Sequence, residues 1–318
     1  MSTYKQIAGT DIEVLSSDPA NPVEGQVWYN STSNTVKANF INPGSWATGG
    51  DLNTGRYGLG GAGTQTAALA FGGSLPAATG VTESYDGTSW TEVNDLNTAR
   101  YYIAGAGTQT AALGFGGIDS TPAVTAVTES WNGTSWTEVN DLNTARDFLA
   151  GAGTQTAALA FGGETPAATG ATETWNGTSW TEVNDLNTAR IRTAGTGAQT
   201  SALLFGGGPA TALTESWNGT SWTEVNDLNT ARLNLAGAGA DNTSALAFGG
   251  FIPPSTGVTE SWNGTSWTEV NDLNTARAQF EGAGTQTAGL AFGGFSPGIT
   301  AATEEWNAGP STITFSDS

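Results

Sequence analysis

The side chains that could carry catalysis in this chain are carboxylates, because its 318 residues include no His and no Cys. Disulfides, thiolate nucleophiles, thiolate metal sites and histidine-dependent acid–base mechanisms are therefore excluded. A pair of carboxylates is sufficient for glycoside hydrolysis. Most of the carboxylates recur at the same position in each repeated unit, whereas the acids of an active site should differ from one unit to the next. The acids that do differ in this way are Asp119, Asp147, Glu164, Asp241 and Glu281.

This pattern predicts a protein that is not an enzyme, with a glycoside hydrolase as the least favoured alternative. Calcium needs several oxygen ligands, and no Asp-x-Asp-x-Asp loop is present, so we expect no metal and no cofactor. The net charge of −20, from 29 Asp and Glu against nine Lys and Arg, should repel nucleic acid and anionic membranes. Because there is neither a signal peptide nor an apolar run of about 18 residues, we expect synthesis in the cytoplasm and no membrane insertion.

Six of the nine cations are one repeated arginine, which ends each copy of the block Asp-Leu-Asn-Thr-x-Arg. A ring of six arginines could bind an anion. Each copy, however, surrounds its arginine with three carboxylates, and we therefore expect structural ion pairs with an Asp of the block or with a repeated Glu. The arginines are Arg56, Arg100, Arg146, Arg190, Arg232 and Arg277, and the glutamates are Glu83, Glu129, Glu173, Glu215, Glu260 and Glu304.

The units that carry these arginines follow one another every 42 to 46 residues and read as four short strands each. Strand A is Gly- and Ala-rich, strand B ends in Phe-Gly-Gly, and strands C and D form a hairpin across Asn-Gly or Asp-Gly. This dipeptide predicts a type I′ turn, which would place Trp131 opposite Thr134 and Glu129 opposite Trp136. Four strands per unit without helical periodicity predict an all-β fold, a β-propeller.

The last unit lacks strand D, and the missing sequence occurs near the other end of the chain, around Ser45 and Trp46. We therefore expect residues 44–50 to complete the sixth blade, which leaves no open sheet edge. The expected organisation is an N-terminal module at residues 1–43, a six-bladed propeller at residues 44–306 and a C-terminal tail at residues 307–318.

The order of residues within a unit resembles the kelch repeat, which joins a double glycine, a Tyr, a Trp and an Arg. Here Gly72-Gly73, Tyr85-Asp86, Trp90 and Arg100 reproduce that order. The other units have Trp at the Tyr position. The resemblance covers about 260 residues and implies a kelch-like propeller, but it implies no particular function, because such propellers serve as enzymes, adaptors and binders.

The N-terminal module does not share the repeat. Residues 26–30 and 35–40 predict a small hairpin around residues 31–34. Residues 22–37 resemble short modules at the front of bacteriophage tail, fibre and other virion proteins, which implies attachment to other virion proteins through residues 1–43. The alternative is an ordered extension that caps the ring, because a two-stranded hairpin is marginally stable alone.

Variation between the units is concentrated in the B–C loops and in the two residues that follow each repeated arginine, which a propeller places on one face. Aromatic and amide side chains suit sugars, so we expect this variable face to bind a ligand. The alternative is drift of exposed loops. The expected ligand-binding residues are Tyr57, Tyr101, Tyr102, Phe148, Arg192, Asn234 and Gln279.

Together these features favour a non-enzymatic bacteriophage virion component whose variable face recognises a host surface, with glycan as the expected ligand. Many copies per particle would convert weak sites into useful avidity. The alternative is a purely structural virion decoration or plug protein.

Overall fold

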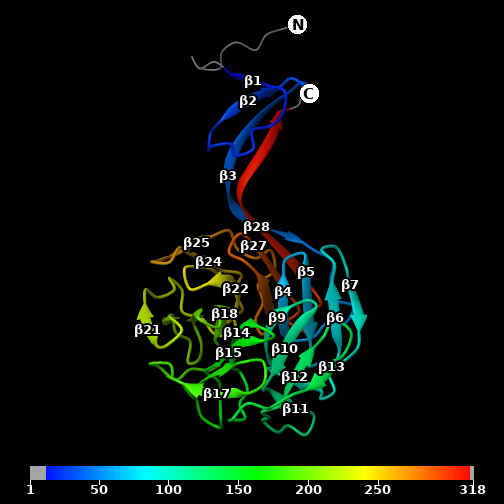
Figure 1. Cartoon of the computed structure of the whole chain (residues 1–318), viewed down its shortest axis with the longest axis vertical. Helices are drawn as coiled ribbons and strands as arrows, with labels where there is room; N and C mark the ends of the chain where they lie inside the picture. The colour runs from blue at the N-terminus through cyan, green and yellow to red at the C-terminus, as the bar shows by residue number, and fades with distance from the viewer. Residues whose placement is uncertain (1–11, 316–318) are drawn as a thin grey trace. The chain divides into compact units, whose positions relative to one another are not determined.

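The computed structural model describes residues 12–315, which form β-strands joined by turns and loops (Figure 1). Within those residues no helix is long and apolar enough to span a membrane. The chain divides into two compact units. One runs from Trp46 to Trp306, and the other combines the described parts of residues 1–45 and 307–318. Residues 307–315 thus group with the N-terminal segment, where a separate tail was expected.

The Trp46–Trp306 unit repeats one pattern of strands. Its first strands are Gly- and Ala-rich: β4 (Gly60–Thr64), β9 (Ala104–Thr108), β14 (Ala150–Thr154), β18 (Ala194–Ala198), β22 (Ala236–Asp241) and β26 (Glu281–Gly284). The second strands end in the Phe of Phe-Gly-Gly: β5 (Ala67–Phe71), β10 (Ala111–Phe115), β15 (Ala157–Phe161), β19 (Ser201–Phe205), β23 (Ser244–Phe248) and β27 (Ala288–Phe292).

The third strands start with Thr-Glu: β6 (Thr82–Tyr85), β12 (Thr128–Trp131), β16 (Thr172–Trp175), β20 (Thr214–Trp217), β24 (Thr259–Trp262) and β28 (Thr303–Phe315). The fourth strands start with Trp: β7 (Trp90–Val93), β13 (Trp136–Glu138), β17 (Trp180–Val183), β21 (Trp222–Val225) and β25 (Trp267–Val270). The described residues contain five four-stranded antiparallel sheets in this order. A further sheet has the order β1-β2-β3-β28-β27-β26, and β8 (Arg100–Tyr101) pairs with β11 (Ile118–Asp119).

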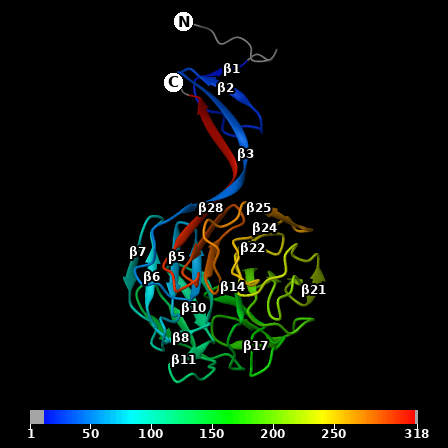
Figure 2. The same ribbon diagram turned by 180° about the vertical axis from the view of Figure 1, so that it is seen from behind.

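The first strands contact one another from sheet to sheet, β4 with β9, β9 with β14, β14 with β18, β18 with β22 and β22 with β26 (Figure 1). Figure 2 shows the same sheets from behind. Strand β26 also contacts β4. Glycine at the second position of these strands permits the approach. A Cβ on Gly105 would lie 2.2 Å from the carbonyl oxygen of Gly61. This separation is too short for any residue larger than glycine.

Aromatic side chains fill the spaces between sheets. Phe71 of one sheet meets Trp136 of the next edge-on, with ring centroids 4.9 Å apart, and the Trp136 Nε1–H donates to Thr82 Oγ1 at 3.1 Å. Burial of each such side chain contributes roughly 2–3 kcal/mol. The bond from a fourth-strand Trp to a third-strand Thr recurs as Trp90–Thr303, Trp180–Thr128, Trp222–Thr172 and Trp267–Thr214.

Trp46, which lies in β3 (Thr35–Thr48), makes the same contacts as the fourth-strand tryptophans. Its Nε1–H donates to Thr259 Oγ1 at 3.1 Å, and its ring meets Phe248 edge-on at 4.9 Å. Its carbonyl accepts from Asn274 Nδ2 at 3.1 Å, as the carbonyl of Trp267 does from Asn229. In the sheet order β3 lies next to β28, as β25 lies next to β24 in its own sheet.

The C–D hairpin differs from the expected one. Trp131 lies directly opposite Trp136, and Glu129 opposite Glu138, so the expected pairing of Trp131 with Thr134 is wrong. The reason is the Asn132 side chain, whose Oδ1 accepts from the backbone N–H groups of Thr134 and Ser135 at 2.9 Å. This side-chain turn closes a four-residue loop in place of a two-residue type I′ turn.

In the N-terminal unit, β2 (Val27–Asn30) pairs antiparallel with β3, as the sequence predicted for residues 26–30 and 35–40. Strand β1 (Glu13–Leu15), which was not expected, pairs parallel with β2. Trp28 is fully buried. Asp18 accepts hydrogen bonds from Trp28 Nε1, Asn30 Nδ2 and Lys37 Nζ at 2.6–3.0 Å, and these donors lower the pKa of Asp18 to about 2.

Candidate functional site

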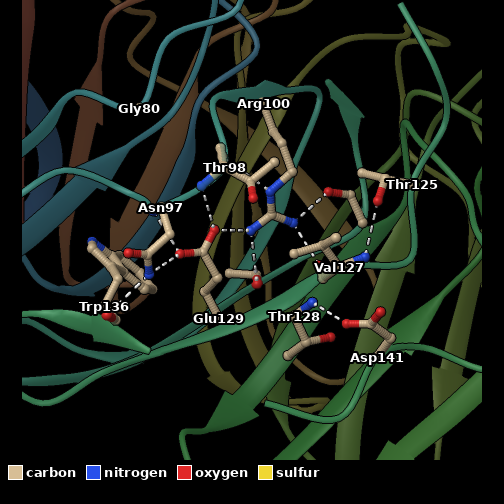
Figure 3. Close-up of polar contacts among 12 residues, drawn as sticks. Gly80, Asn97, Thr98, Arg100, Thr125, Val127, Thr128, Glu129, Trp136 and Asp141 are labelled. Carbon is tan, nitrogen blue, oxygen red and sulfur yellow. Dashed lines mark hydrogen bonds and ion pairs between the residues drawn. The ribbon is translucent and has the colours of Figure 1, made fainter. Parts of the chain in front are cut away.

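The repeated arginines are structural, as Figure 3 shows for one sheet. Arg100 and Glu129 are fully buried, with Arg100 Nη2 3.0 Å from Glu129 Oε1. Arg100 Nη1 also donates to the carbonyls of Gly116 and Val127, at 2.8 and 2.6 Å. Glu129 Oε2 accepts from the backbone and side-chain nitrogens of Asn97 at 2.7 and 2.8 Å. Burial lowers the pKa of Arg100, and the attraction of Glu129 opposes that effect.

Every repeated arginine has the same kind of partner, a third-strand glutamate in place of the Asp of its block. The Asp of the block accepts a different hydrogen bond. In one unit, Asp141 Oδ1 accepts from the backbone N–H of Thr128 at 3.0 Å. The arginines therefore do not form a ring of free cations. The pairs are Arg56–Glu83, Arg100–Glu129, Arg146–Glu173, Arg190–Glu215, Arg232–Glu260 and Arg277–Glu304.

The second residue after each repeated arginine lies at one small opening of about 80 Å³. The structure brings together five of the seven residues expected on the variable face, and the first unit contributes a glycine. Tyr57 and Tyr101 do not line the opening. They flank it, with their ring centroids 6.2 and 4.8 Å from that of Tyr102. The residues at the opening are Gly58, Tyr102, Phe148, Arg192, Asn234 and Gln279.

Side chains around the opening contact one another across sheets. Tyr102 stacks on Phe148 with a centroid distance of 3.8 Å, and the Arg192 guanidinium lies 4.7 Å from the Phe148 centroid. Gln279 Nε2 donates to Tyr102 Oη at 3.0 Å. Burial raises the pKa of Tyr102 to about 12, so its hydroxyl stays protonated and can itself donate a hydrogen bond.

The backbone at the opening is strained. Tyr102, Phe148, Arg192, Asn234 and Gln279 have φ between +50° and +58°, a left-handed conformation that costs a residue with a side chain roughly 1–2 kcal/mol. Their N–H groups connect the residues, for example Asn234 N to Arg192 O at 2.9 Å and Gln279 N to Asn234 O at 3.0 Å. The Gly58 N–H donates to the Gln279 carbonyl at 2.8 Å.

A larger groove of about 610 Å³ lies beside the opening, between the B–C loops that follow β23 and β27. Phe251 and Phe295 line it and are 38% and 40% exposed. Three expected residues, Arg192, Asn234 and Gln279, line it as well. The individual loop residues were not predicted as ligand contacts. Their signal was in the sequence, because only these two loops place Phe directly after the Gly-Gly pair.

The acids that depart from the repeat do not form one cluster. The backbones of Asp147 and Glu164 are bridged, and burial together with Glu164 raises the pKa of Asp147 to about 6. Glu281 lines the opening from β26, where burial raises its pKa to about 8. Asp119 and Asp241 each accept hydrogen bonds in local turns. In residues 12–315 no group of three or more Asp, Glu, His or Cys is arranged to hold a metal ion.

Comparison with known proteins identifies the fold. No protein-family profile and no curated protein matches the chain. A solved structure titled "Structure of YjhT" superposes with a TM-score of 0.68 at 13% sequence identity, over 81% of this chain and 96% of that chain. Together with the repeated four-stranded sheets, this similarity defines a β-propeller fold. At this identity the likeness concerns the fold alone.

Proposed function

We propose that the Trp46–Trp306 unit is a closed, six-bladed, kelch-like propeller in which β3 supplies the last fourth strand. Three observations support this proposal. Strand β26 contacts both β22 and β4. Trp46 repeats the Trp–Thr hydrogen bond of the other sheets. The backbone N–H of Thr303 donates to Asp51 Oδ1 at 3.1 Å, which is the bond that Thr128 makes with Asp141 inside its own sheet.

We further propose that the protein is a non-enzymatic bacteriophage virion component that recognises a host surface through the variable face. The strain at the opening is the observation that carries this proposal. Glycine adopts positive φ without cost, and Gly58 shows that it fits. Five of the six equivalent positions nevertheless keep a large side chain. Drift would favour the relaxed residue, whereas selection for binding explains why side chains are retained despite their strain.

The ligand class that fits the variable face best is a glycan. Phe251 and Phe295 offer exposed rings against which a sugar ring can pack. Asn234 and Gln279 bring amide groups, which donate and accept hydrogen bonds, to the same groove. Residues 1–43 would attach the protein to other virion proteins, and many copies on one particle would add their weak contacts.

The test is binding of the full chain to a glycan array and to host cells. Phe251→Ala and Phe295→Ala should each lower binding at least tenfold, because each removes a ring from the groove. Val124→Ala is the matched control, since Val124 is 40% exposed in another B–C loop and does not line the groove. Absence of binding to any glycan or cell would contradict the recognition role and favour a purely structural virion protein.

The virion role needs a separate measurement, which is labelling of purified particles with an antibody against this chain. We expect labelled particles. Unlabelled particles, with the protein found free in the lysate, would contradict the virion role and leave the glycan proposal to the binding assay.

A further inference from the structure

Among the residues that the structure describes, Arg192 is the cation that has no ion pair. Lys37 pairs with Asp18, and each of the six repeated arginines pairs with a third-strand glutamate. The equivalent positions of other units hold Gly, Tyr, Phe, Asn and Gln. The positive charge of Arg192 is therefore not part of the repeated scaffold, and its electrostatic attraction to Asp147 acts without a direct ion pair.

Arg192 is held in place by an aromatic ring and by its backbone conformation. Its guanidinium lies over the Phe148 ring at 4.7 Å, and its backbone is fixed at φ +57°. Within the described part of the chain its buried Nε atom has no hydrogen-bond partner, and the same is true of the neighbouring Thr193 Oγ1. The Nε atoms of Arg146, Arg232 and Arg277 lack a partner in the same way, although those arginines are paired with glutamates. What distinguishes Arg192 is therefore its unpaired charge at the wall of the groove.

The surroundings of Arg192 restrict what kind of molecule can bind there. Arg192 lines both the opening and the groove. Phe251 and Phe295 provide the apolar wall of the groove, and Asn234 provides an amide. A ligand that satisfies all of these groups has a flat apolar face, neutral polar substituents and one anionic group. A polyanion is disfavoured, because the net charge of the protein is −20.

We propose that the groove binds an acidic sugar and that Arg192 is the residue that recognises its carboxylate. This inference rests on the proposed glycan-binding function and specifies its ligand class. Stacking on Phe148 engages the face of the guanidinium, while the N–H groups of an arginine donate in the plane and match a carboxylate in a two-pronged geometry. The amides of Asn234 and Gln279 bind the hydroxyls of the same sugar.

The test is titration of the full-length protein with an oligosaccharide that carries a single hexuronic acid residue and with the same oligosaccharide after reduction of its carboxyl group. The acidic form should bind roughly 10- to 100-fold more tightly, as expected for a hydrogen bond between charged groups. Arg192→Gln should abolish that preference, because the charge and the two-pronged donor are both lost, and it should weaken binding of the acidic form more than binding of the neutral form. Arg192→Lys should keep part of the preference, because the charge remains but the two-pronged geometry is lost.

Three results would overturn the inference. Equal affinity for the acidic and neutral forms would do so, and so would an acidic preference that survives in Arg192→Gln. If a hexose phosphate bound as tightly as the hexuronic acid, the assignment of a carboxylate as the group that Arg192 recognises would be contradicted. In each case Phe295→Ala still tests the proposed glycan function, since it should weaken both forms alike. If neither form binds, both proposals fail together.

Discussion

Replacement of Arg100 by Met is expected to destabilise the propeller strongly, because it leaves Glu129 as a buried charge without its cation. Both side chains are fully buried. Loss of one partner of such a pair costs about 3–5 kcal/mol. The Gly116 carbonyl also loses its arginine donor, whereas the Val127 carbonyl keeps the backbone N–H of Gly116. The two nitrogens of Asn97 still bind Glu129 and offset part of the loss.

The expected change in the free energy of unfolding is therefore about 4 kcal/mol, which corresponds to a fall in melting temperature of roughly 8–16 °C. Thermal unfolding followed by circular dichroism measures it. Arg192→Met is the matched control, because Arg192 has no ion pair among the described residues. We expect that control to change stability by less than about 1 kcal/mol.

A second variant separates the buried charge from the lost packing. In Arg100→Met with Glu129→Gln the remaining side chain is neutral, so its burial is less unfavourable, and we expect the double variant to be more stable than Arg100→Met alone. A loss below about 1 kcal/mol in Arg100→Met would refute the reasoning. A double variant no more stable than the single one would do the same, since the cost would then not come from the uncompensated charge.

The remaining predictions concern strain, buried charge and close packing. Gln279→Gly should be more stable than Gln279→Ala by about 1 kcal/mol in denaturant titration, because only glycine relaxes at φ +58°, and equal stabilities would contradict strain at this position. The pKa of Glu281 is about 8 in the folded protein against an ordinary value of 4.5, so the folded state holds a proton that the unfolded state has lost. Stability should therefore fall as pH rises from about 4.5 to about 8, by at most roughly 5 kcal/mol, and Glu281→Gln should flatten this dependence; an unchanged slope would contradict it. Gly105→Ala should lower the melting temperature by more than 5 °C because of the Gly61 carbonyl, whereas Gly298→Ala, with no atom within 4 Å of the new Cβ, should not. Similar melting temperatures for these two variants would argue against close strand packing.

The repeated four-stranded sheets were predictable from the sequence, because near-identical units make each strand visible several times over. The small residues of β9 and the Phe at the end of β10 recur at fixed spacing, and the structure confirms an all-β arrangement with a propeller fold. Counting the charges of one unit left two candidate partners for Arg100, the Asp of the repeated block and the repeated Glu. Only the fold shows that Glu129 is the partner, because that depends on which strand passes beside the arginine.

Other features depend on details that periodicity does not carry. The turn after Trp131 was expected to contain two residues, but the Asn132 carboxamide bonds to two backbone N–H groups and extends the loop to four. Similarly, the sequence places Phe148 and Arg192 after repeated arginines but gives no sign that both have positive φ. Left-handed conformations of large residues come from tertiary constraint, which propensity does not report. The groove around Phe251 and Phe295 arises because two loops distant in sequence become neighbours.

The repetition of the scaffold and the strain of the variable face are connected energetically. Five left-handed residues cost roughly 5–10 kcal/mol together, which is comparable to the whole stability of an ordinary domain. Such a sum is tolerable only where the surrounding structure determines the backbone independently. Here each unit contributes the same buried Arg–Glu network and the same Trp–Thr bond between sheets. These interactions fix the backbone of the second residue after each repeated arginine, whatever side chain that residue carries. The scaffold can therefore stay nearly constant while that one position changes from Tyr to Phe, Arg, Asn or Gln, and this is the arrangement that a surface selected for recognition requires.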